Sequence, residues 1–129
     1  MSSGPLPSQR CLLSDLTTRH VGDKVRFLGC VTGYSTHSAI LTLRHEYPRG
    51  TNDNVNADVA LLLQRLKAEQ TDIGQWVHVI GYITSIEQTL AKATMGSRTA
   101  SVGVQVLVLW IAEDLDITSY EHAFIPKAG

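Results

Sequence analysis

The sequence predicts a small β-barrel with a short helix at each end and a further helix between its third and fourth strands. Three observations support this prediction. Five segments have the length and alternating side chains typical of strands, and a segment with helical spacing separates the third from the fourth. Glycines interrupt the first and fourth of these segments, as the sharp bends of a small closed barrel require.

The beginning of the chain predicts a tail followed by a short helix. Residues 1–10 contain two prolines and several small polar residues, which predict a disordered tail with no resemblance to a signal peptide. Residues 11–129 are predicted to form one domain, because a chain of this length can bury a core of its own. Leu12, Leu13 and Leu16 have helical spacing and predict a short helix against the domain.

The first predicted strand covers Val25–Tyr34 and follows a turn that contains glycine. Alternation places Val25, Phe27 and Val31 on one face of this strand. The opposite face carries Arg26, Leu28, Cys30, Thr32 and Tyr34. Gly29 lies in the middle of the strand, where a glycine usually marks a bulge or a sharp bend.

The next segments predict two strands and a helix. Ala39–Glu46 is predicted as the second strand, and the polar residues 47–54 as a loop. Val55–Lys67 is ambiguous, because its apolar run suits either a strand or a helix. We divide this region into a strand over about 55–60 and a helix over about 61–70, in which Leu62 and Leu66 form an i, i+4 pair.

Two strongly apolar strands are predicted near the end of the chain. Gln75–Ile86 is predicted as the fourth strand, Val104–Ala112 as the fifth, and the polar residues 87–103 as a loop that is partly extended at most. Each of these strands carries a tryptophan. We expect Trp76 and Trp110 to pack in the core, where each indole N–H needs a hydrogen-bond partner.

The last predicted element is a helix. Thr118 and Glu121 have the spacing of an N-terminal capping box. Tyr120, Ala123 and Phe124 then form an apolar stripe along one face. Two interpretations of the stripe remain open: it closes one end of the barrel, or it contacts a groove of a partner protein. Both hold if some residues face inward and Tyr120 faces outward.

This order of elements predicts the oligonucleotide/oligosaccharide-binding (OB) fold, a five-stranded barrel. A single nucleic-acid strand needs rings that stack on its bases and cations that meet its phosphates. The candidate residues for that role are Tyr34, His37, Arg44, Tyr47, Lys92 and Arg98. Ordinary solvent exposure is the alternative for each. Because rings are few and the net charge is -1, we expect the isolated chain to bind nucleic acid weakly or not at all.

Several classes of function are disfavoured by the composition. Cys11 and Cys30 are too few for a disulfide scaffold or a cysteine zinc site, and the five histidines lack metal-binding spacing. The sequence shows neither a nucleophile–base pair nor a phosphate-binding glycine loop. We therefore predict no enzyme, no metal and no cofactor. Apolar runs are shorter than the roughly 18 residues that a membrane span needs.

Four stretches of the chain carry a resemblance to a known family. They are 22–31 (GDKVRFLGCV), 39–43 (AILTL), 73–83 (IGQWVHVIGYI) and 104–110 (VQVLVLW) followed by 116–123 (DITSYEHA). In this combination the chain resembles the smallest subunit of the CST telomere-capping complex, particularly its fungal members. That family is a single OB fold and is similar to the small subunit of replication protein A.

The resemblance implies a non-enzymatic nuclear protein at chromosome ends. It would form a heterodimer with a larger OB-fold subunit of the CST complex, protect single-stranded telomeric DNA with it, and assist fill-in synthesis by DNA polymerase alpha-primase. The residues implied in partner binding are Arg26, Ile117, Tyr120, Ala123 and Phe124. For Arg26, solvent exposure on the barrel exterior is the alternative. The alternative function is an autonomous single-strand-binding protein of replication-protein-A type.

Overall fold

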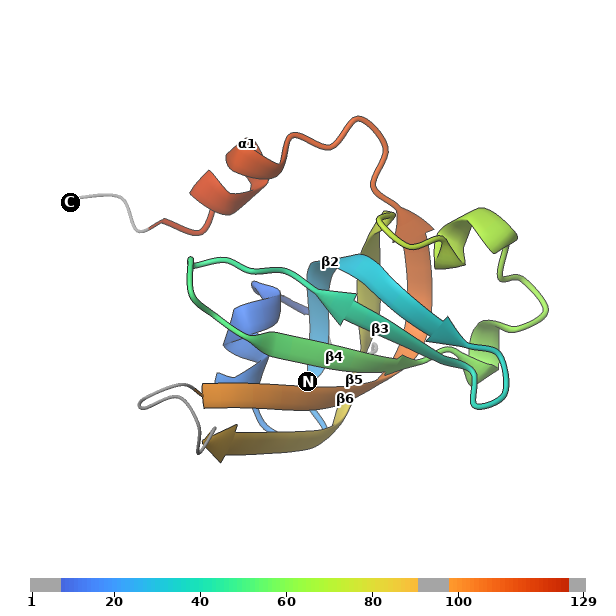
Figure 1. Ribbon diagram of the computed structural model, residues 1–129, viewed down its shortest axis with the longest axis horizontal. Helices are drawn as coiled ribbons and strands as arrows, with labels where there is room; N and C mark the ends of the chain where they lie inside the picture. The colour runs from blue at the N-terminus through green and yellow to red at the C-terminus, as the bar shows by residue number, and fades with distance from the viewer. Residues whose placement is uncertain (1–7, 91–97, 126–129) are drawn as a thin grey trace, which may run out of the picture.

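Six strands form one sheet that closes on itself (Figure 1). In the computed structural model, which describes residues 8–90 and 98–125, the strand order is β1-β2-β3-β4-β6-β5, and β2 also pairs with β5. The strands are β1 (Gln9–Arg10), β2 (Lys24–Ser35), β3 (Ile40–Arg44), β4 (Asp53–Asp58), β5 (Trp76–Leu90) and β6 (Arg98–Ile111). β4 and β6 run parallel, whereas the other pairs of long strands are antiparallel. The five long strands close a barrel, which confirms the predicted OB fold.

Aliphatic side chains from every long strand fill the barrel, and Phe27 is the largest fully buried residue. The 3-10 helix η1 (Leu13–Thr18) contributes Leu13 and Leu16 to this core. Its contacts with β2, β4, β5 and β6 place it across one end of the barrel. The short N-terminal helix predicted from the leucine spacing therefore forms, as a 3-10 helix, and it closes the barrel.

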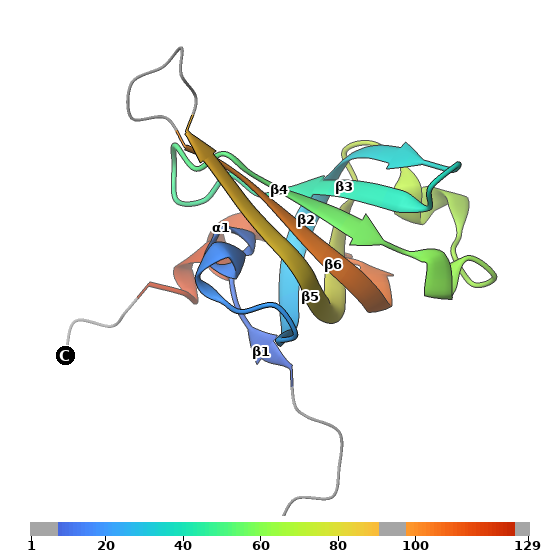
Figure 2. The ribbon, with the colours of Figure 1, turned by 90° about the horizontal axis from the view of Figure 1, so that it is seen from below.

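β1 lies within the segment predicted as a disordered tail. Gln9 and Arg10 pair in parallel with Val25 and Arg26 of β2, and the Cys11 N–H donates to the Arg26 carbonyl at 2.9 Å (Figure 2). These hydrogen bonds are made with the otherwise unpaired edge of β2. The composition of residues 1–10 does not reveal that edge, so it could not predict the pairing. For residues 9–10 the predicted disorder is therefore wrong, and residues 1–7 lie outside the described residues.

Two glycines shape the barrel in different ways. The register between β5 and β6 shifts at Ile80/Gly81, so Gly81 lies at a bulge as expected for a bent strand. Gly29 does not mark a bulge, because the shift between β2 and β3 falls at Val31/Gly33. A Cβ at position 29 would lie 2.9 Å from the Cβ of Leu43, so Gly29 is required there for close packing.

The helix predicted over residues 61–70 does not form as one element. Two 3-10 turns, η2 (Ala60–Leu62) and η3 (Ala68–Thr71), connect β4 to β5 instead. Local side chains bind the backbone there: Asp58 accepts from the Ala60 N–H at 2.9 Å, and Gln70 accepts from the Lys67 N–H at 2.7 Å. Such bonds compete with a continuous helix. Leu62 and Leu66 nevertheless pack against the core, as their spacing indicated.

The last two strands are longer than predicted. β5 continues to Leu90 and β6 begins at Arg98, so most of the predicted loop over residues 87–103 is a paired hairpin. In the β6 part of this hairpin, Ala100 and Val102 are buried, whereas Glu87 and Gln88 of β5 are exposed, so one face of the pair belongs to the core.

The helix α1 (Ile117–His122) follows β6 and lies on the outer surface of the barrel (Figure 1). Its N-cap lies two residues before Thr118, the N-cap that the sequence predicted. Asp116 is the N-cap and accepts from the Ser119 N–H at 3.1 Å and from the Ser119 hydroxyl at 3.0 Å. Within residues 8–90 and 98–125, the helices are too short to cross a membrane.

Candidate functional site

Seven rings gather on the outer surface of the barrel beneath α1, and we call them the aromatic cluster. They are His45, Tyr47, Trp76, His78, Trp110, Tyr120 and Phe124. They come from the loop after β3, from β5 and β6, and from α1 and the residues that follow it. Neighbouring ring centroids lie 5.1–6.3 Å apart. The cluster thus joins segments that are distant in the sequence.

The alternation of β5 and β6 places both tryptophans in this cluster. Val77 and Val79 face the barrel interior, so Trp76 and His78 face outward and are half-buried. Trp110 of β6 pairs in register with His78, and their rings stack at 5.1 Å. The prediction that the tryptophans lie in the core is therefore wrong. Phe27 and aliphatic side chains fill the narrow barrel, and the larger indoles remain on its exterior.

His45 anchors α1 to the barrel. Only 4% of this residue is exposed, and its Nε2 lies 2.8 Å from Oε2 of Glu121. The His45 ring also meets the Trp76 ring edge-on at 5.3 Å and contacts the ring of Tyr120. Nδ1 has no hydrogen-bond partner among the described residues. The sequence does not indicate a role for His45, because nothing local marks a histidine that pairs across the fold.

Two arginines border the aromatic cluster. The guanidinium carbon Cζ of Arg10 lies 5.3 Å from the centroid of Tyr120 and 5.1 Å from that of Phe124. Cζ of Arg26 lies 5.3 Å from the centroid of Trp110. These are cation–π distances. Burial raises the pKa of the Tyr120 hydroxyl above its usual value, and the positive charge of Arg10 opposes that shift.

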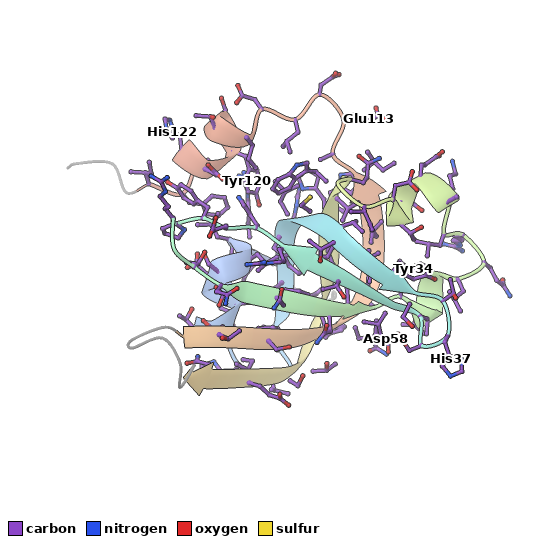
Figure 3. The ribbon with its side chains drawn as sticks, viewed as in Figure 1. Tyr34, His37, Asp58, Glu113, Tyr120 and His122 are labelled. Carbon is purple, nitrogen blue, oxygen red and sulfur yellow. The ribbon has the colours of Figure 1, made fainter. Side chains whose placement is uncertain are left out.

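α1 packs on the barrel exterior and does not fill the barrel. Tyr120, Glu121 and Phe124 are half-buried on the side that faces the barrel, whereas His122 and Ala123 are exposed (Figure 3). No residue of α1 is fully buried. Leu13 and Leu16 of η1 close the end of the barrel instead.

The residues implied in partner binding lie close to one another. The rings of Tyr120 and Phe124 are 5.2 Å apart, and Ile117 and Ala123 lie on or directly after the same helix. Arg26 joins them through Trp110, whose stacked neighbour His78 contacts Tyr120.

A groove continues from the aromatic cluster toward η3. It has a volume of about 560 Å³ and is lined by Trp110 and His78 on one side and by Lys67, Glu69 and Gln70 on another. Its walls combine ring surface with charged groups at the rim. A lining of this mixed polar and apolar kind is typical of protein–protein interfaces.

The four described residues among those implied in nucleic-acid binding do not form one cluster. Tyr34 and His37 lie at the end of β2 and in the turn after it (Figure 3), whereas Arg44 is the last residue of β3, at the other end of that strand. The Arg44 guanidinium donates to Asn52 at 2.8 Å, and Tyr47 belongs to the aromatic cluster. Lys92 and the side chain of Arg98 lie outside the described residues.

The usual nucleic-acid surface of an OB barrel is the outer face of the strands that correspond to β3 and β4. In this chain that face carries Thr42 and Arg44 on β3 and Asn54, Asn56 and Asp58 on β4. Among the described residues of β3 and β4 there is no aromatic side chain on which a base could stack.

The stability of the fold is expected to depend on pH through His78. Burial, followed by the charges of Arg26 and Arg10, lowers the pKa of His78 below its usual value. The unfolded chain then binds a proton more readily, so the stabilisation is present above about pH 6.5 and is lost as the pH falls through the folded pKa. We expect the free energy of unfolding to fall by up to about 1 kcal/mol between pH 8 and pH 5, since solvent screens the site.

Urea unfolding of the isolated chain at both pH values measures this change. H78N should reduce it, whereas H37Q, a change in the exposed β2–β3 turn, should leave it as in the unmodified chain. An equally large fall in H78N would contradict this assignment.

Comparisons with known proteins agree with the barrel fold. A family model named Ten1, described as "Telomere capping, CST complex subunit", matches residues 1–124. The chain is similar to the telomere capping protein Ten1 from Saccharomyces pombe, with 20% identity and a TM-score of 0.65, over 91% of this chain and 93% of that one. It is also similar to a chain of the S. pombe Stn1–Ten1 complex, with 20% identity and a TM-score of 0.67, over 93% and 90% respectively.

A more distant similarity extends to a translation enzyme. Asparaginyl-tRNA synthetase from Entamoeba histolytica shares 12% identity with a TM-score of 0.52, over 95% of this chain and 28% of that one. No curated protein sequence matches significantly. These solved structures support the same barrel fold, and the family model covers nearly the whole chain.

Proposed function

Because the chain belongs to the Ten1 family of telomere-capping CST complex subunits, we propose that it is a non-catalytic subunit that binds a larger OB-fold protein of the Stn1 type. The partner surface consists of Ile117, Tyr120, Ala123 and Phe124 with the adjoining part of the aromatic cluster. The observation that carries this proposal is the position of α1. It lies outside the barrel and leaves Tyr120 and Phe124 half-buried and the neighbouring Ala123 exposed.

The chemistry of the surface supports this assignment. Tyrosine, tryptophan and arginine are the residues that dominate the binding energy of protein interfaces. Here Tyr120, Trp110 and Arg26 are held in fixed positions by ring stacking and cation–π contacts before any partner binds. Such preorganisation lowers the entropic cost of association. The groove beside Trp110 would receive a side chain of the partner.

The proposed role in the nucleus is assembly at chromosome ends. Together with its larger partner, the chain would protect telomeric single-stranded DNA and support fill-in synthesis by DNA polymerase alpha-primase. The chain itself would contribute little affinity for DNA, because the outer face of its β3 and β4 lacks described aromatic side chains. That observation disfavours the alternative of an autonomous single-strand-binding protein.

Co-expression with the Stn1-type subunit of the same organism tests the proposal. We expect a stable complex with one copy of each chain, measured by size-exclusion chromatography with light scattering. Elution of the chain alone would contradict the proposal. In a parallel titration with a single-stranded oligonucleotide, tight and salt-dependent binding by the isolated chain would instead favour the autonomous function.

A further inference from the structure

We propose that the free edge of β6 at Leu109 and Ile111 binds an extended segment of a protein other than the Stn1-type subunit, which adds to the sheet as a strand. The segment would place an aliphatic side chain in a hollow beside the edge and an acidic side chain near its rim. This inference goes beyond the proposed function. The edge faces the η2–η3 segment, which lies on the opposite side of the molecule from α1 in both ribbon views (Figure 1 and Figure 2).

β6 loses its neighbour on one side partway along its length. β4 pairs with β6 in parallel only as far as Asp58 and Gln105. The chain then turns away, and the Val59 N–H donates to the Ala39 carbonyl at 2.9 Å. β6 itself continues to Ile111 with β5 on its other side. Among the described strands, none pairs with this remaining edge, so an added strand would take up the position that β4 leaves.

The main-chain groups of this edge point away from β5. The Ala112 N–H donates to the Trp76 carbonyl at 2.9 Å, and residue pairs of an antiparallel ladder alternate between bonded and non-bonded. Leu109 and Ile111 therefore direct their N–H and carbonyl groups outward. Within residues 8–90 and 98–125, the Gln70 amide is the group that binds this edge, by donating to the Leu109 carbonyl at a long 3.4 Å. The edge thus offers main-chain donors and an acceptor to an added strand.

The sequence does not shield this edge in the usual ways. Native sheets protect free edges with charged residues or proline, and residues 106–112 (VLVLWIA) contain neither. The register shift opposite Ile80 and Gly81 falls at Leu107, before the free main-chain groups begin. Val108 beside them is 48% exposed. An apolar edge of this kind is a template for pairing with another chain.

A small hollow beside the edge suits an aliphatic side chain. It has a volume of about 170 Å³ and lies between β6 and the η2–η3 segment. Most of its lining is aliphatic: Leu62, Leu66, Leu107, Val108 and Leu109. The two leucines of the η2–η3 segment already pack against the core, so the hollow is part of the folded barrel and does not depend on a partner for its walls.

The surroundings favour an acidic extended peptide over other occupants. The η2–η3 segment stands beside the edge, which suits a single strand better than the edge of a second folded copy. Arg65 is the charged residue that lines the hollow, and it is exposed and has no ion pair within the described part of the chain. An acidic side chain would complement it. Because no aromatic ring lines the hollow, the bases of a nucleic acid would have nothing on which to stack.

Titration of the full chain with a synthetic peptide, followed in amide NMR spectra, tests this inference. The probe is an end-capped peptide of about ten residues, a usual strand length, in which valine and leucine alternate with threonine and glutamate. We expect a Kd below about 1 mM, with shifts confined to β6 at residues 107–111 and to the η2–η3 segment. V108E should weaken binding by about tenfold or more, because it places a like charge beside the glutamates of the peptide. The matched control V21E, the same change at an exposed valine elsewhere, should stay within about threefold.

Two modified peptides test the strand pairing itself. One is N-methylated on its odd residues and the other on its even residues, so that only one of them loses the N–H groups that face β6. We expect that peptide to bind at least about tenfold more weakly and the other to stay within about threefold of the unmodified peptide. R65E should weaken binding by about threefold to fivefold, since an exposed ion pair contributes little. R49E, the same charge change in the loop between β3 and β4, is its control.

The outcomes separate this inference from the proposed function. Failure of the peptide to bind, equal affinities of the two N-methylated peptides, or unchanged binding by V108E and R65E would each overturn the strand site and leave the α1 surface standing. Displacement of the peptide by a single-stranded oligonucleotide would show a nucleic-acid site instead. Displacement by the Stn1-type subunit would show that the edge belongs to the heterodimer interface, and the separate partner would be wrong. Y120A should bind the peptide like the unmodified chain, although we expect it to lose the Stn1-type subunit.

Discussion

Replacing Tyr120 by alanine is expected to abolish co-purification of the larger subunit while the isolated chain remains folded. Tyr120 contacts the rings of His45, His78 and Phe124 and the guanidinium of Arg10, so it is the centre of the proposed partner surface. Truncation of a central tyrosine typically costs 2 kcal/mol or more, which is about a 30-fold loss of affinity. The fold should survive, because Tyr120 does not belong to the buried core of the barrel.

A pull-down with the Stn1-type subunit, together with circular dichroism of each free chain, checks this result. F124A should behave in the same way, since Phe124 packs on Tyr120 and Arg10. H122A is the matched control, because His122 lies on the same helix and points away from the barrel (Figure 3). If Y120A and F124A both unfold the free chain, the apolar stripe is a structural element of the barrel and this surface is not an interface.

The largest effect on stability is expected from G81A. A Cβ at position 81 would collide with the backbone carbonyl oxygen of Gln105 and would lie 2.8 Å from Cγ1 of Val104. Because the first contact is with the backbone of β6, the two strands must move apart at the bulge. Overpacking of this kind typically costs about 1–3 kcal/mol of unfolding free energy, and a backbone clash belongs at the upper end.

Urea unfolding measures the loss, and Gly33 provides the control. Gly33 also lies in a strand next to a register shift, but a Cβ there would meet nothing within 4 Å. G33A should therefore change the free energy of unfolding by less than about 1 kcal/mol. Equal losses in G81A and G33A would show that the close approach of β5 to β6 does not limit stability.

The strands of the barrel could be predicted because alternation is a local signal. In β5, Val77 and Val79 alternate with Trp76 and His78, and this pattern alone identifies a strand. It does not say which set faces inward, because both sets are apolar enough for a core. The decision depends on volume: valines fit the interior of a narrow barrel and indoles do not. Both tryptophans were therefore assigned to the wrong face.

The segment between β4 and β5 could not be predicted as reliably. Leu61, Leu62 and Leu63 are consecutive, so they cannot all face the core in either a helix or a strand. In the structure, Leu62 packs against the core, and Leu61 and Leu63 remain 62% and 51% exposed. Side-chain hydrogen bonds from Asp58 and Gln70 hold this segment in short turns, and propensity does not reveal such bonds.

From the sequence, only the part of the candidate site that lies within one short segment could be predicted. The spacing of Tyr120 and Phe124 indicated α1 and its apolar side. His45 and Arg10 were missed because each reaches the site through pairing with a distant segment, His45 with Glu121 and Arg10 with Arg26. Arg10, moreover, belongs to a segment whose composition predicts disorder. Only the assembled sheet shows that it faces α1.

The double pairing of β6 bears on how the chain is made. β6 joins β4 along one edge, where Asp53 pairs with Ala100, and β5 along the other. A growing chain on the ribosome therefore cannot complete its barrel until β6 has emerged. Until then, the edges of β4 and β5 that pair with β6 remain unpaired. Closing such a long loop is entropically slow compared with forming local contacts. Newly synthesised chains are therefore prone to aggregate until β6 has paired, and a chaperone would have its largest effect during this interval.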